Sequence, residues 1–194
     1  MANVLICYGT TEGQTGKIAA RMAEFAAEWG HAATVADAAT SSARLPLGAF
    51  DAVVVAASVH RRRHQESVER FVRENLPALQ RLPTAFFSVS LSAAGREPRQ
   101  RDGARACADA FLQATGWRPG TVRLVAGALA YSRYGLLTRR LMQLIAWRES
   151  GDTDTSRDYE YTDWEKLRRD LEVFLAHAVP READLRPIFA GEGV

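Results

Sequence analysis

Short apolar runs alternate along the chain with longer segments whose apolar positions recur every three or four residues. The apolar runs, several of them uninterrupted, occupy residues 3–8, 32–36, 51–58, 83–90 and 122–129. The helical patterns between them occupy residues 14–29, 66–79, 101–115 and 163–178. Uninterrupted apolar strands are typical of a sheet that is covered on both faces. Because strand and helix alternate regularly, the pattern predicts an α/β fold with a doubly wound, five-stranded parallel sheet.

One segment, residues 131–150, interrupts this alternation after the fifth strand. Within it, Leu137, Leu141, Leu144 and Ile145 recur at helical spacing, so we expect an inserted amphipathic helix. Two interpretations stay open. The apolar face packs on the protein's own core, or the helix lies at a membrane surface or a partner, with its arginines meeting anionic groups.

The final helical pattern carries a start signal and a stop signal. Thr162 is followed three residues later by Glu165, which is the spacing of a capping box, so Thr162 is the expected N-cap. Pro180 is expected to end the helix and to begin a loose tail over residues 180–194. A chain of 194 residues suits one domain. We therefore expect a single domain over residues 1–179.

Composition narrows the location of the protein. No segment reaches the ~20 uninterrupted apolar residues that a membrane-spanning helix needs. Cys7 and Cys107 are the only cysteines, one in a predicted strand and one in a predicted helix, and no cleavable signal precedes the first strand. We expect the protein to work in a reducing cytoplasm, with both thiols serving as core residues.

The net charge of +2 conceals an uneven distribution of arginine. Six arginines and no acidic residue lie between Arg118 and Arg148, and Arg61, Arg62 and Arg63 form a second cluster. Anionic partners are therefore expected. Nucleic acid is not expected among them, because no helix-turn-helix, zinc-finger or RNP-like motif accompanies the arginines.

The loop at residues 10–15, between the first strand and the first helix, is the main candidate for chemistry. A strand, a Gly- and Thr-rich turn and a helix favour an anion, because free backbone N–H groups and the helix dipole point at it. The dinucleotide pattern G-x-G-x-x-G would need glycine at Thr11 and Gln14. A nucleotide P-loop would need glycine at Thr11 and a hydroxyl at Ile18 to bind Mg²⁺. Both patterns fail.

The loop instead resembles the phosphate loop of the flavodoxins. Thr10, Gly13 and Thr15 match the pattern of that family, and Glu12 stands where the family usually has Ser or Thr. The resemblance implies a flavodoxin-like sheet of strand order 2-1-3-4-5, with the inserted helix after strand 5. It also implies an FMN phosphate held without metal by Thr10, Thr11, Glu12, Gly13, Gln14 and Thr15. The alternative is a plain helix entry that Thr10 or Thr11 caps.

In such a sheet the flavin ring lies at the carboxyl ends of the strands, at the switch between strands one and three. The ring-side residues expected from the resemblance are Ser58, Val59 and His60 in one loop and Ser88, Val89, Ser90, Leu91 and Ser92 in the other. The stretches "SVHRRRH" and "SVSLSAAG" contain no aromatic residue, unlike the shielding rings of electron-carrier flavodoxins. An open flavin face suits hydride transfer.

The arginine cluster adjoins this ring-side loop. Arg61, Arg62 and Arg63 would favour reduced, anionic flavin and attract a carboxylated substrate; the alternative is a solvated run of charge. His60 and His64 lie nearby, yet a lone histidine is more often solvated or hydrogen-bonded than catalytic. Flavin N5 accepts a hydride unaided, so no catalytic side chain and no metal site are assigned.

A closer resemblance is to the quinone-dependent protoporphyrinogen IX dehydrogenases of haem synthesis. It rests on "GQTGKIA", "VVVAASVH", "FFSVSL", "GWRP", "VAGALAYSRY" and "GDTDTSRDYEYTDWE", in that order between residues 13 and 165. The resemblance implies removal of six electrons from protoporphyrinogen IX through FMN to menaquinone or ubiquinone. Relatives often have Tyr and Gly where this chain has Arg61 and Arg62, so the substrate-side loop departs from the family.

The resemblance also implies peripheral contact of residues 131–150 with the inner face of the cell membrane. The two propionates of the substrate would bind to arginines, which agrees with the basic clusters. A quinone acceptor in the membrane requires membrane contact, which agrees with the inserted helix. Three alternatives stay open: a flavodoxin-type electron carrier, a general FMN-dependent quinone reductase, and a flavin-free interaction module that keeps the fold. The sequence does not decide whether the protein forms an oligomer.

Overall fold

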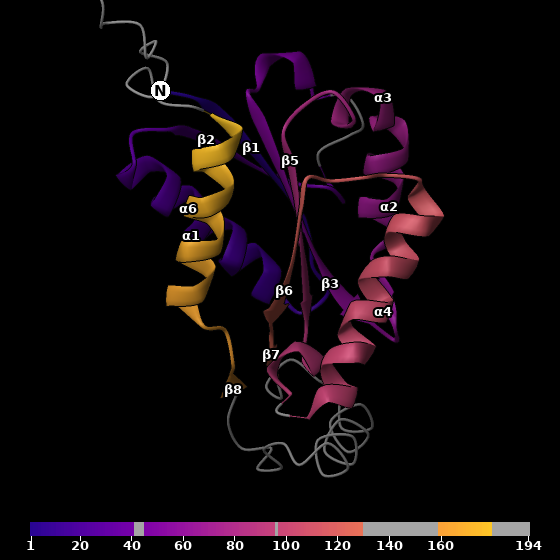
Figure 1. Cartoon of the computed structure of the whole chain (residues 1–194). Helices are drawn as coiled ribbons and strands as arrows, with labels where there is room; N and C mark the ends of the chain where they lie inside the picture. The colour runs from indigo at the N-terminus through magenta and orange to yellow at the C-terminus, as the bar shows by residue number, and fades with distance from the viewer. Residues whose placement is uncertain (41–44, 96, 130–158, 180–194) are drawn as a thin grey trace, which may run out of the picture.

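The computed structural model describes residues 1–40, 45–95, 97–129 and 159–179 of the chain (Figure 1). The strands are β1 (Asn3–Gly9), β2 (Ala32–Asp37), β3 (Ala52–His60), β4 (Arg63–His64), β5 (Thr84–Ser90), β6 (Thr121–Ala126), β7 (Ala128–Leu129) and β8 (Tyr159–Glu160). The α-helices are α1 (Gln14–Glu28), α2 (Glu66–Glu74), α3 (Leu76–Leu79), α4 (Pro98–Thr115) and α6 (Trp164–Ala178). Two 3-10 turns, η1 (Leu47–Ala49) and η2 (Ser92–Ala94), complete the described elements.

The main sheet is parallel and has the strand order β2-β1-β3-β5-β6. Counted by main strands this is 2-1-3-4-5, so the expected flavodoxin-like order is confirmed. The short strand β4 adds an antiparallel hairpin to the end of β3. A separate antiparallel pair joins β7 to β8, with Leu129 opposite Tyr159.

Helices cover both faces of the sheet (Figure 1), with α1 and α6 on one side and α2, α3 and α4 on the other. Strand β3 shows why its sequence is apolar throughout. Val54 and Ala56 face the α1/α6 layer, whereas Val53 and Val55 face the α2/α4 layer, and all four are fully buried. Since a strand alternates sides at every residue, successive positions of this central strand meet one apolar layer and then the other.

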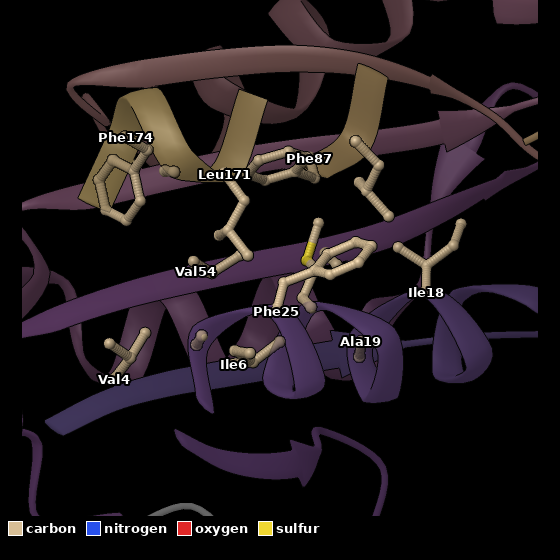
Figure 2. Packing of buried hydrophobic residues seen from close by; sticks show 14 of the residues in the cluster. Val4, Ile6, Ile18, Ala19, Phe25, Val54, Phe87, Leu171 and Phe174 are labelled. Carbon is tan, nitrogen blue, oxygen red and sulfur yellow. The ribbon is translucent and has the colours of Figure 1, made fainter. Parts of the chain in front are cut away.

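Figure 2 shows the core between the sheet and the α1/α6 layer. Ile18 and Phe25 of α1 and Leu171 of α6 point toward Val54 and Phe87 of the sheet. Full burial of a large apolar side chain contributes about 1.5–3 kcal/mol. These contacts hold α1, and with it the loop that precedes α1, at a fixed height on the sheet.

Four elements differ from the sequence prediction, three of them in their extent. The helix expected over 66–79 is broken at Asn75, because Pro77 has no N–H to continue the backbone ladder. Helix α4 begins at Pro98, earlier than residue 101, since Glu97 and Gln100 form a capping box. The fifth strand ends at Ala126: the Gly127 N–H makes a last hydrogen bond to β5, at the Ser90 carbonyl, and the Gly127 carbonyl accepts the Tyr161 N–H.

The start of α6 also differs from the prediction. Asp163 is the N-cap, and its side chain accepts the backbone N–H of Lys166 at 2.8 Å. The Thr162/Glu165 capping box is therefore wrong. Thr162 lies one residue too early because its hydroxyl donates to the Ala126 carbonyl at 2.8 Å, which ties the helix start to the end of β6.

The inserted helix expected over 131–150 and the tail expected over 180–194 lie outside the described residues. The structure does describe the elements on either side of the first segment, β7 before it and β8 after it, which pair with each other. Among the helices of the described residues, none is long and apolar enough to cross a membrane.

Candidate functional site

The candidate site lies at the carboxyl ends of β1, β3 and β5, where the chain leaves the sheet. The first of its loops follows β1. Gly13 takes a left-handed conformation with φ 91° and serves as the N-cap of α1, without a side-chain cap. Thr10 Oγ1 accepts the Gly13 N–H at 2.8 Å, and Lys17 N–H reaches the Gly13 carbonyl at 3.2 Å. The threonine thus closes the loop rather than capping the helix.

This geometry leaves several donors for an anion. The backbone N–H groups of Gln14, Thr15 and Gly16 belong to the first turn of α1 and have no partner within the helix. Thr15 is fully buried, and its hydroxyl has no hydrogen-bond partner among the described residues. A buried, unpaired hydroxyl is costly unless a ligand satisfies it. The loop therefore fits a phosphate group, which accepts hydrogen bonds on several oxygens.

The side chain of Gln14 has other partners. Its amide donates to Glu160 Oε1 and to Thr162 Oγ1, both at 2.9 Å, so the backbone N–H is the part of Gln14 left for an anion. Lys17 joins the same contact, with Nζ 2.7 Å from Glu160 Oε2. Burial alone would raise the pKa of Glu160, but the hydrogen bonds from Lys17 and Gln14 and the lysine charge together lower it. This contact links α1 to β8.

Tyr8, the last residue but one of β1, packs its ring against Gly16 in the first turn of α1. A Cβ on Gly16 would lie 3.2 Å from the Tyr8 ring, so glycine is needed for the ring to approach α1 this closely. Partial burial raises the pKa of the Tyr8 hydroxyl, and the Asp37 carboxylate, which also bonds it, raises that pKa further. Tyr8 therefore stays protonated.

The second loop is the hairpin between β3 and β4. His60 pairs with Arg63, which leaves Arg61 and Arg62 as a two-residue turn with φ 50° and 66°. Two positive φ values are typical of a type I′ turn, which ordinarily takes Asn and Gly. The three arginines are exposed. They lie on the hairpin at the carboxyl end of β3, and their role toward a substrate stays a prediction.

His64 follows this hairpin and is buried. Its Nε2 lies 3.0 Å from Ser88 Oγ, and its ring packs against Phe86 and Phe111 at centroid distances of 5.3 and 5.0 Å. Burial lowers the pKa of His64 to about 4. His64 is therefore neutral at physiological pH, and the Ser88 hydroxyl, also fully buried, faces the histidine.

The remaining predicted ring-side residues come together at the same edge but present different groups. Val89 is buried in the α1/α6 core, so its backbone is the part that a ligand can reach. Ser90 Oγ accepts the Ala93 N–H at 3.2 Å, while Leu91 is partly buried and Ser92 begins η2. Val59, at the end of β3, is also partly buried.

Sequence reasoning missed two residues that organise this edge. The side-chain amide of Gln65 donates to Thr11 Oγ1 at 3.0 Å and also to Ser58 Oγ. Gly9 ends β1 so close to α2 that a Cβ there would meet Val68 Cγ2 at 2.3 Å. Gln65 carries no motif that marks it, because its partners lie 54 and 7 residues away in sequence.

Comparison with known proteins connects this geometry to a family. A model of the flavodoxin domain matches residues 5–156. Protoporphyrinogen IX dehydrogenase [quinone] of Escherichia coli strain K12 is 35% identical over 164 residues, which cover 84% of this chain and 89% of that protein. The protein of the same name from Leishmania major is 30% identical over 197 residues, covering 98% of this chain and 83% of its own length.

Solved structures agree on the fold. Oxidised flavodoxin 1 from Bacillus cereus superposes with a TM-score of 0.55 at 15% identity, covering 90% of this chain and 98% of its own. A flavodoxin from the domain Archaea superposes with a TM-score of 0.51 at 12% identity, covering 91% and 98%. At this level of identity the likeness extends to the fold alone.

Proposed function

Because the chain belongs to the flavodoxin domain family, and within it to the family of the quinone-dependent protoporphyrinogen IX dehydrogenases, we propose that it oxidises protoporphyrinogen IX through bound FMN. The product is protoporphyrin IX, and the electrons pass to a membrane quinone, either menaquinone or ubiquinone. Loss of six electrons corresponds to three successive two-electron oxidations. Each of them is followed by transfer of two electrons to one quinone.

FMN binding is supported by two features of the same loop, the left-handed backbone of Gly13 and the buried hydroxyl of Thr15. The left-handed Gly13 turns the chain so that the first amides of α1 point into the loop, and the unpaired Thr15 hydroxyl lies buried beside them. These groups match the 5′-phosphate of FMN in kind, since they are donors facing an anion. The loop supplies them without a metal ion.

The ring-side loops carry the redox part of the proposal. FMN supplies two-electron acceptance at its ring, and the protein's part is to hold that ring and admit the substrate. The loops at Ser58–His64 and Ser88–Gly95 bring no Phe, Tyr or Trp side chain to this edge, so the ring keeps a face open to the porphyrinogen. His64 is neutral and buried against Ser88, and it takes no proton in this scheme.

The arginine hairpin is proposed to receive the substrate. Protoporphyrinogen IX carries two propionates, and Arg61, Arg62 and Arg63 are three exposed cations at the end of β3. A cluster of one sign of charge raises the local concentration of an oppositely charged substrate. This role explains why basic residues occupy a turn that glycine would fill with less strain.

The quinone side of the proposal involves residues 131–150, as a peripheral contact with the inner face of the cell membrane. In sequence they lie between β7 and β8, which pair with each other. Glu160 of β8 contacts Lys17 and Gln14 of α1, directly after the phosphate loop. A membrane contact made by this segment is therefore attached at the edge of the sheet where the flavin is proposed to bind.

Two measurements test the proposal. Purified protein should retain FMN, and it should convert protoporphyrinogen IX only when a quinone is supplied. Reduction by a general donor without porphyrinogen turnover would instead identify a flavodoxin-type carrier or a general quinone reductase. Absence of any flavin would identify an interaction module.

The phosphate loop is tested by substitutions at Thr15. Thr15→Val removes the unpaired hydroxyl and should weaken FMN binding about tenfold or more, because a hydrogen bond to a charged group contributes about 1.5–3 kcal/mol. Thr15→Glu should abolish FMN retention through bulk and like charge. Thr34→Val, on exposed β2, is the matched control. Unchanged FMN affinity in both Thr15 variants would exclude this loop as the phosphate site.

A further inference from the structure

Gln65 stands at the junction of the loops that surround the candidate site. It is the N-cap of α2, yet its side chain makes no capping bond. Instead, its amide nitrogen donates to Thr11 in the loop after β1 and to Ser58 at the end of β3. Glutamine is not among the residues preferred at an N-cap, which are Ser, Thr, Asp and Asn. Here its side chain bridges two loops instead of capping the helix.

The position of Gln65 is fixed from three sides. Gly9 lies against it, because a Cβ on Gly9 would be 3.3 Å from Gln65 Oε1 and 2.3 Å from Val68 Cγ2. The residue before it, His64, is anchored in the core by Ser88. The residue after it begins α2, whose Val68 is fully buried. Consecutive residues, His64 and Gln65, thereby connect all three loops of the site.

The direction of these hydrogen bonds has a chemical consequence. A hydroxyl offers one donor and two acceptor positions. Since Gln65 Nε2 donates to Thr11 Oγ1 and to Ser58 Oγ, the protons of both hydroxyls remain available for donation elsewhere. Gln65 therefore leaves two hydroxyl donors for the site, that of Thr11 at the phosphate loop and that of Ser58 at the ring-side strand.

We propose that Gln65 is a positioning residue for the flavin nucleotide, which orients the Thr11 hydroxyl toward the phosphate and the Ser58 hydroxyl toward the ring. This inference rests on the proposed function, because it presumes that FMN is the ligand. It assigns to Gln65 a role that acts through Thr11 and Ser58 rather than by direct chemistry. Its effect should be largest on the phosphate, which carries the charge.

The test compares FMN with riboflavin, which lacks the phosphate. Titration of the flavin-free protein gives both dissociation constants for the natural chain, Gln65→Leu, Thr11→Val and the double variant. Gln65→Leu should weaken FMN about tenfold and riboflavin less, so that the preference for FMN falls. Thr11→Val should lower the preference to a similar degree, and the double variant should lower it no further, because both changes remove one interaction.

Two further variants sharpen the result. Gln65→Glu replaces the donor by an acceptor, which draws both hydroxyl protons away from the ligand and adds negative charge, so it should weaken FMN more than Gln65→Leu does. Gln80→Leu is the matched control, because Gln80 donates to the Gly116 carbonyl in a loop outside the three that surround the site. It should leave both dissociation constants unchanged.

Each outcome decides the matter. An unchanged preference for FMN in Gln65→Leu, with a lower melting temperature, would show a structural brace and overturn the inference while FMN binding stands. If Gln65→Leu does not fold, Thr11→Val still decides, since Thr11 is exposed and its substitution spares the core. A natural chain that binds neither flavin would overturn the proposed function itself.

Discussion

His64 is an uncharged histidine enclosed by aromatic rings, and it couples stability to pH. Its pKa is lowered by burial from 6.5 to about 4. In the unfolded chain the imidazole of His64 therefore binds a proton near pH 6.5, whereas in the folded chain it binds one only near pH 4. The stabilisation is complete above pH 6.5 and is lost as the pH falls toward 4.

This coupling predicts a difference between the natural chain and His64→Gln. Between pH 7 and pH 4 the natural chain should lose about 3 kcal/mol more of its free energy of unfolding than the variant, since each pKa unit corresponds to about 1.4 kcal/mol. Urea denaturation at several pH values measures it. The variant is the reference because it keeps the carboxylates that also titrate near pH 4. Parallel pH curves for the two proteins would contradict the buried, neutral state.

Arg61 and Arg62 combine charge with backbone strain, and the two effects can be separated. Replacing them by Asn and Gly suits the positive φ values of the turn and should raise the free energy of unfolding by about 1 kcal/mol or more. The same double variant should weaken capture of the anionic substrate and flatten its dependence on salt.

Arg63→Gln is the control for charge alone, because Arg63 lies in β4 outside the strained turn. It should weaken capture with little change in stability. Replacing all three arginines by Gln tests the cluster as a whole, with substrate KM measured against ionic strength. Collapse of thermal stability with unchanged salt-dependent capture would show that the arginines are structural.

At the scale of elements, sequence periodicity predicted the strands and the helices that cover them. It did not predict side-chain contacts between residues that are far apart in the chain. The apolar pattern of β3 and the spacing of Ile18, Phe25 and Leu171 suffice to predict buried strands and the helices that cover them. The turn between β1 and α1 was also predictable, because Thr10, Gly13 and Thr15 are close in sequence, whereas phosphate binding there stays a prediction. These features depend on local order alone.

The missed features depend on residues far apart in the chain. Thr162 reads as a cap until the Ala126 carbonyl competes for its hydroxyl across 36 residues. Gln65 reads as an ordinary surface residue until β1 and β3 bring Thr11 and Ser58 to it. Such hydrogen bonds cannot be predicted from local sequence patterns, because the neighbouring residues carry no signal for them.

Thr162 provides the test at this scale. Thr162→Val should lower the free energy of unfolding by about 1–3 kcal/mol, because it leaves the Ala126 carbonyl and the Gln14 amide without their partner. Asp163→Ala should cost about 1 kcal/mol through loss of the helix cap. Glu165→Ala should have little effect, and a loss there as large as that in Asp163→Ala would restore the capping box. Chemical denaturation measures all three.

At the scale of the whole molecule, the β7–β8 pair makes residues 130–158 removable. Leu129 and Tyr159 face each other on antiparallel strands, so an Asn-Gly turn joining them fits a two-residue hairpin. The shortened chain should stay folded and keep FMN, because it retains the contacts that the described residues of the core make with one another. It should no longer bind anionic vesicles or reduce membrane quinone efficiently.

Vesicle co-sedimentation and quinone turnover measure this prediction, with FMN fluorescence as the control for folding. Intact vesicle binding and turnover in the shortened chain would remove the membrane role. Loss of FMN together with unfolding would show instead that the excised segment belongs to the core.

The strand order also determines when a newly made chain completes the proposed flavin site. Strand β1 is synthesised first, but it lies between β2 and β3, and β3 in turn pairs with β5, which ends at Ser90. Parallel neighbours meet only after the connecting helices have been made. A nascent chain that ends before β5 has the phosphate loop without the second ring-side loop. Under the proposed function, capture of the flavin is therefore a late event of biosynthesis, and the flavin absorbance of a preparation should report the fraction of molecules in which β5 has joined the sheet.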